Sequence, residues 1–207
     1  FDDRSGMEWY NTWDGLRGIE LRLPRLRWLN KVVVEHLSTM DQSGPLHFID
    51  FNHDKYPGYG GGADNYYNNG EYTTGASYFN RSLGSPFLIS PEYNKNGLLG
   101  FRHNRVRAWH LGISGQVCRD VTYRVKASSV ESFGTPYAPT LRNLTLFSIV
   151  TDWRYTYRSR SRKEERELPD WEFGVAAGID RGSLLGNHWG LSFSVIKQGV
   201  FDRTFQR

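Results

Sequence analysis

The chain has 207 residues, a net charge of +4 at pH 7, a mean hydropathy of −0.60 and 15% aromatic residues. No apolar run approaches the ~18–20 residues that a membrane-spanning helix needs, and no basic block or recognition motif indicates a nucleic-acid partner. Cys118 is the only cysteine, which excludes an intrachain disulfide and a cysteine-based zinc site. No linker divides the sequence, so we predict a single domain over residues 1–207.

The first elements in chain order are predicted to form a hairpin around Pro24, with strands over residues 15–23 and 27–39. Apolar residues alternate with polar or small ones in the first strand. In the second strand residues 32–34 are all Val, so the alternation does not decide which of them lie on the apolar face.

A long connection over residues 41–70 follows the hairpin. It is rich in Gly, Tyr and Asn, which combine a free backbone with flat rings and hydrogen-bonding groups. These are features of a loop that contacts sugars, although a solvated loop tip has the same composition. We predict a further strand over residues 71–80.

The second half of the chain carries the clearest signal, because apolar and polar residues alternate in five successive segments. A period of two marks a strand with two unlike faces. We place a tight turn at residues 115–118, and in total we predict about eight strands and no helix. The five segments cover residues 109–114, 121–128, 147–158, 171–180 and 189–195.

The cost of placing a charged side chain in lipid decides which face of the strands is turned toward the membrane. A Lys or Arg that faces lipid at mid-bilayer costs roughly 2–4 kcal/mol, so Arg124 and Lys126 should face an enclosed polar interior. Several patterned runs reach about 9–13 residues, as tilted membrane strands do, whereas strands of ordinary sheets average about 5–6 residues. We therefore predict an all-β fold, an antiparallel transmembrane β-barrel with apolar side chains facing lipid.

Short motifs spread over nearly the whole chain resemble the Wzi family of capsule-assembly proteins. The most characteristic is the segment over residues 104–112, Asn-Arg-Val-Arg-Ala-Trp-His-Leu-Gly, which resembles the "NR…HLG" segment of that family. Each motif is short, and it is their shared order that carries the resemblance. The other motifs cover residues 5–8, 64–68, 83–86, 90–91 with 93–94, 134–135, 180–182, and 184–187 with Gly190.

The resemblance implies a large barrel in the outer membrane of a Gram-negative cell that helps to attach capsular polysaccharide to the cell surface. Proteins of that family act as surface lectins and not as enzymes, and they are roughly twice as long as this chain. We therefore expect a chain that lacks its N-terminal part, and strands that form one arc of a larger barrel. The expected partners are capsular or other surface polysaccharide and outer-membrane lipid.

For ligand binding, we predict that basic side chains facing the interior hold an acidic glycan while tyrosines stack on its rings. Guanidinium groups bind carboxylates in a bidentate manner, and aromatic rings cover apolar sugar surfaces. Alternatively, the same cations form a closed network with Glu20, Asp152, Glu172 and Asp180, because buried charges must be paired. The predicted binding residues are Arg22, Arg124, Lys126, Arg154, Arg158, Tyr66, Tyr67 and Tyr72.

We predict no catalytic residue, no metal and no cofactor. His110 and Ser114 would share a strand face but lie ~13 Å apart along the strand, so they cannot hydrogen-bond directly. The spacing of His47, Asp50, His53 and Asp54 matches no standard metal loop. Two further functions stay open: a porin-like channel with an Arg-rich lumen, and a soluble β-sandwich that binds carbohydrate.

Overall fold

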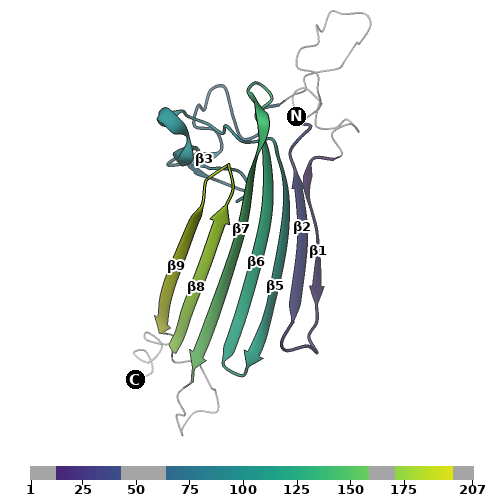
Figure 1. Cartoon of the computed structure of the whole chain (residues 1–207), viewed down its shortest axis with the longest axis vertical. Helices are drawn as coiled ribbons and strands as arrows, with labels where there is room; N and C mark the ends of the chain where they lie inside the picture. Colours follow the sequence, from purple (N-terminus) through teal and green to yellow (C-terminus); the bar gives the residue numbers. More distant parts are fainter. Residues whose placement is uncertain (1–12, 43–63, 159–170, 198–207) are drawn as a thin grey trace, which may run out of the picture. The chain divides into compact units, whose positions relative to one another are not determined.

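The computed structural model describes residues 13–42, 64–158 and 171–197, and in these ranges the fold is all-β. Its main feature is a seven-stranded antiparallel sheet in the order β1-β2-β5-β6-β7-β8-β9 (Figure 1). The predicted all-β antiparallel fold is thereby confirmed. The sheet consists of β1 (Gly15–Arg22), β2 (Lys31–Ser38), β5 (Val106–Cys118), β6 (Val121–Gly134), β7 (Pro139–Tyr157), β8 (Trp171–Arg181) and β9 (His188–Lys197).

Smaller elements lie between β2 and β5. Strands β3 (Ser77–Tyr78) and β4 (Arg81–Ser82) pair as a short hairpin, and single 3-10 turns η3 (Pro91–Tyr93) and η4 (Lys95–Gly97) follow. Within the described ranges, no helix has the length and hydropathy of a membrane span.

The register of β7, β8 and β9 places like side chains in rows across the sheet. Trp153 pairs with Val175, which pairs with Phe193 on the next strand. One residue along β7, Arg154 pairs with Gly174, which pairs with Ser194. Because successive side chains point to opposite faces, one face of these strands is apolar and the other is polar.

The tight turn predicted at residues 115–118 is wrong. Strand β5 continues through Cys118, and the turn lies at Arg119 and Asp120. Glycine at position 115 allows the backbone of Trp28 to come close, since a Cβ atom at this position would lie 2.1 Å from the carbonyl oxygen of Trp28. A glycine inside a strand can mark such an approach as well as a turn.

The predicted strand over residues 71–80 is also wrong, because only Ser77 and Tyr78 are extended and paired. The Asn69 side chain accepts hydrogen bonds from the backbone amides of Glu71 and Tyr72, at 2.8 and 3.0 Å. Local bonds of this kind compete with strand pairing. Gly75, at a φ of 65°, then continues the turn.

Contacts across β2 and β5 settle the face of the three valines. The rings of His36 and Trp109 lie 4.5 Å apart between centroids, so His36 lies on the apolar face with Trp109. By parity Val32 and Val34 share that face. Val33 lies on the polar face, because its Cβ would be 3.7 Å from a Cβ atom added at Gly112.

The chain divides into two compact units, and we describe each by itself. Unit 1 comprises Phe1–Arg17, Glu35–Trp109 and Ser129–Leu146, and unit 2 comprises Gly18–Val34, His110–Ser128 and Phe147–Arg207. All the buried hydrophobic side chains of the described residues belong to unit 1: Leu37, Leu88, Ile89, Phe101, Val106, Ala108, Val130 and Leu146. The described part of unit 2 is a sheet that buries none.

Candidate functional site

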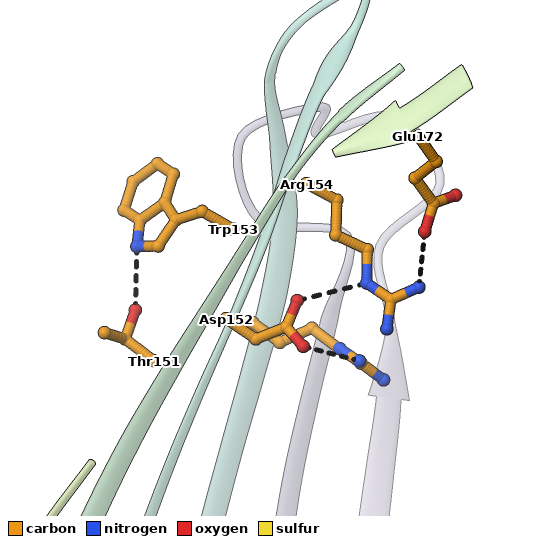
Figure 2. Close-up of polar contacts among 6 residues, drawn as sticks. Thr151, Asp152, Trp153, Arg154 and Glu172 are labelled. Carbon is orange, nitrogen blue, oxygen red and sulfur yellow. Dashed lines mark hydrogen bonds and ion pairs between the residues drawn. The ribbon is translucent and has the colours of Figure 1, made fainter. Parts of the chain in front are cut away.

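A cluster of four charged side chains occupies the polar face of unit 2. The Asp152 carboxylate accepts hydrogen bonds from Arg124 Nη2 and Arg154 Nε, both at 3.1 Å. Arg154 Nη1 donates a further bond to Glu172 Oε1 at 2.8 Å. Figure 2 shows Asp152 and Arg154 on one side of β7, and Thr151 and Trp153 on the other. Asp152 therefore links cations from β6 and β7 into one network.

The other predicted cations of unit 2 occupy separate places. Arg22 and Lys31 both pair with Glu20, and Arg158 Nε lies 3.8 Å from Asp120 Oδ1. Lys126 is exposed and has no ion-pair partner among the described residues.

Three of the four acids named in the network alternative form ion pairs, but Glu20 does so apart from the cluster around Asp152. Glu20, Asp152 and Glu172 form ion pairs with the predicted cations, whereas Asp180 forms none with a described residue. The pairs remain accessible to solvent, since the side chains of Arg124 and Arg154 are 49% and 41% exposed. Such accessible pairs contribute little to stability.

The three predicted tyrosines belong to unit 1, and their settings differ. The ring centroids of Tyr67 and Phe101 lie 5.6 Å apart. Cε1 of Tyr67 would lie 3.4 Å from a Cβ atom if residue 84 were not glycine. Tyr66 contributes backbone groups to a buried network, whereas Tyr72 is 71% exposed. Tyr72 is therefore the most open of the three rings. Stacking on a sugar stays a prediction.

Unit 1 contains a buried amide network that the sequence did not reveal. Asn104 is fully buried, and its Nδ2 donates to Asn65 Oδ1 and to the Tyr66 carbonyl oxygen, both at 2.6 Å. Asn68 Nδ2 donates to the same Asn65 oxygen at 3.0 Å. The two motifs at residues 64–68 and 104–112 thus contact each other. Only their polar composition could have indicated this.

The network also ties β5 to the chain after β2. The carbonyl oxygen of Asn104 accepts bonds from Thr39 Oγ1 at 2.6 Å and from Gln42 Nε2 at 3.0 Å. Thr39 Oγ1 in turn accepts the backbone amide of Val106 at 2.9 Å. Gln42 is itself fully buried. We call Thr39, Gln42, Asn65 and Asn104 the amide network.

Two histidines contact serine hydroxyls. His103 Nδ1 lies 3.0 Å from Ser132 Oγ, and burial lowers the pKa of His103, so this ring is neutral at pH 7. Ser132 is fully buried and so cannot meet a substrate. His110 Nδ1 lies 2.8 Å from Ser128 Oγ, whereas Ser114 donates to Asn30.

Burial also raises the pKa of Asp41, helped by the nearby charge of Asp14. No group of three or more His, Cys, Asp or Glu residues in the described ranges is arranged to hold a metal ion. His47, Asp50, His53 and Asp54 lie outside those ranges.

The apolar face of unit 2 is exposed along β7, β8 and β9. Trp189 and Phe193 of β9 are 82% and 72% exposed, and Trp153, Phe173 and Val175 also present more than a third of their surface. On this face the indole nitrogen of Trp153 is paired, because its Nε1 donates to Thr151 Oγ1 at 2.8 Å (Figure 2). An exposed apolar patch of this extent indicates an interaction surface.

Comparison of the chain with protein-family models, curated proteins and solved structures finds no match.

Proposed function

We propose that the protein is an outer-membrane protein of a Gram-negative cell that binds surface polysaccharide and takes part in capsule assembly or attachment. In this proposal the apolar face of β7–β9 meets lipid hydrocarbon, and the polar face lines the interior of a barrel. The observation that carries it is the exposed apolar face of unit 2, which carries charges only at its ends. The resemblance to the Wzi family supports the capsule part of the proposal.

The charge distribution on this face fits a membrane. From Ile149 to Tyr155 on β7, and on the facing parts of β8 and β9, no side chain on the apolar face is charged. The first charges appear at opposite ends, at Arg181 and Lys197. Charges at the ends of a span reach the polar interface, whereas charges in its middle face hydrocarbon.

The length of the uncharged face fits as well. The apolar side chains of β8 run from Trp171 to Ile179, which is eight residue steps or ~26 Å at strand rise. Tilting the strand by ~35–45° reduces this to ~19–22 Å, near the ~25 Å apolar band of outer-membrane barrels. The Trp153–Thr151 bond supports the same environment, because an unpaired indole N–H is costly in hydrocarbon.

A soluble β-sandwich accounts less well for these observations. In a sandwich the apolar face of one sheet packs against a second sheet about 10 Å away. In the described part of unit 2 no hydrophobic side chain is buried by another layer. We therefore favour lipid as the partner of this face.

The polar face supports the polysaccharide part of the proposal. Arg124 and Arg154 each keep close to half of their side chain exposed although both are paired. A uronic-acid carboxylate can form bidentate bonds to such a guanidinium group. Lys126 adds a cation with no ion-pair partner in the described ranges. An acidic glycan is the ligand that this charge pattern favours.

Removing two of these charges tests the ligand assignment. We expect Arg124→Gln combined with Arg154→Gln to weaken retention of acidic capsular polysaccharide at least tenfold, because each lost charge-assisted bond is worth roughly 1.5–3 kcal/mol and about 1.4 kcal/mol corresponds to a factor of ten. The measurement is binding of polysaccharide extracted from the capsule of the source strain to the purified protein in detergent. Arg25→Gln combined with Arg27→Gln, in the turn between β1 and β2, removes the same charge elsewhere.

Equal binding by the Arg124/Arg154 variant and the wild type would refute a role for these residues in glycan binding. Conductance in planar bilayers examines the porin-like alternative in the same preparation. A steady anion-selective current without polysaccharide binding would favour a channel.

A further inference from the structure

The hairpin of β3 and β4 presents two aromatic rings to solvent. Ser77 pairs with Ser82 and Tyr78 with Arg81, which leaves Phe79 and Asn80 as a two-residue turn. Tyr78 and Phe79 are 67% and 81% exposed. Their ring centroids lie 4.6 Å apart with the planes at 82°, an edge-to-face pair. We call Tyr78 and Phe79 the aromatic tip.

The backbone of this turn does not favour phenylalanine. Phe79 and Asn80 both have positive φ, at 47° and 61°. A two-residue hairpin turn with two positive φ values favours Asn, Asp or Gly, and a bulky residue there is uncommon. Phe79 also gains little from burial, since most of its surface meets water. Both the backbone and the exposure therefore disfavour this residue for folding, and a strained residue of this kind indicates a functional role.

The base of the hairpin is held firmly. The Glu92 backbone amide donates to the Asn80 carbonyl oxygen at 3.0 Å, and Arg81 Nε lies 3.3 Å from Glu92 Oε2. The backbone amide of Ser82 donates to Ser90 Oγ, also at 3.0 Å. These contacts fix the aromatic tip against η3, so its rings are presented without a large loss of conformational freedom on binding.

We propose that the aromatic tip binds the polysaccharide by stacking its rings on apolar faces of the sugars. The hairpin also carries the polar side chains of Ser77, Asn80 and Arg81, and these groups can bond the hydroxyls around a stacked ring. Lipid is a weaker fit, because the 78% exposed Arg81 lies beside the rings, whereas the apolar face of β7–β9 carries charges only at its ends. This inference rests on the proposed function and names a contact for the same ligand.

The substitution Phe79→Asn separates a binding role from a folding role. Asn accepts positive φ readily, so the variant should melt at the same temperature as the wild type or higher. Loss of one ring should nevertheless weaken binding of the extracted capsular polysaccharide by about tenfold, as expected for an aromatic contact that dominates its site. Asn80→Gly is the matched control, because it relaxes the same turn and keeps both rings. Tyr78→Ala should weaken binding in the same direction.

The outcomes are distinct. Weaker binding with undiminished melting temperature for Phe79→Asn, together with wild-type binding by Asn80→Gly, supports the aromatic tip as a sugar contact. Wild-type binding by both Phe79→Asn and Tyr78→Ala overturns it, as does a fall in melting temperature that accompanies the loss of binding. Loss of anionic vesicle binding with polysaccharide binding intact assigns the tip to lipid and also overturns it. If the wild type retains no polysaccharide, the proposed function itself fails.

Discussion

Under the proposed function, substituting Phe193 by Arg is expected to prevent stable insertion of the protein into the outer membrane. Phe193 lies near the middle of β9, pairs with Val175 and is 72% exposed on the apolar face. A guanidinium group at the bilayer midplane of a barrel costs about 2–4 kcal/mol, because it must leave water or distort the bilayer. We would measure the fraction of protein that stays in the outer membrane after a urea wash, and the heat-dependent change in its gel mobility.

The neighbouring residue provides the control for this experiment. Ser192 pairs with Ala176 on the polar face, so Ser192→Arg adds the same charge one residue away on the other side of the sheet. We expect this variant to insert at close to wild-type levels. If both variants insert equally well, the apolar face does not meet hydrocarbon. If Ser192→Arg alone fails, the two faces have been assigned the wrong way round.

The second large effect is expected from Asn104→Ala in the amide network. This change removes both donors of a fully buried side chain and leaves the Tyr66 carbonyl oxygen without that partner. Asn65 Oδ1 keeps only its bond from Asn68. A buried polar group that loses its partner costs about 1–3 kcal/mol, so we expect the free energy of unfolding of unit 1 to fall by about 2–3 kcal/mol.

Hydrogen exchange of individual amides reports this change most directly. The backbone amide of Thr39 donates to the Val106 carbonyl oxygen, and the backbone amide of Val106 donates to Thr39 Oγ1. The protection of both amides from exchange therefore depends on the network. Both should exchange faster in Asn104→Ala. Asn69→Ala is the control, because Asn69 is exposed and bonds only local amides of Glu71 and Tyr72. Unaltered exchange of Thr39 and Val106 would show that the network does not stabilise this part of the chain.

The sequence predicted the sheet because its strongest signal is local. Alternation along β8 needs only the order of residues from Trp171 to Ile179, and the structure pairs them as that order requires. The error at residues 115–118 has the opposite origin. Gly115 is placed by the carbonyl oxygen of Trp28, which is distant in the sequence, and no local pattern encodes that contact.

The charged cluster of the candidate site could be predicted from local alternation, as the sheet could. Parity placed Arg124 and Arg154 on one face, and the acids on that face included their partner Asp152. The aromatic tip was missed because nothing in the sequence indicates a positive φ at Phe79. The strand predicted over residues 71–80 was wrong because the turn there depends on bonds to Asn69 and on Gly75.

Quenching of a probe along β9 tests the central claim most directly. Cys118 is the only cysteine, so a Cys118→Ser background allows a fluorophore to be attached at one introduced cysteine at a time. The account predicts that a lipid-borne nitroxide quenches probes at Leu191, Phe193 and Val195, while a water-soluble quencher reaches those at Ser192 and Ser194. Equal quenching of both sets by the water-soluble agent, with no effect of the nitroxide lipid, would contradict it.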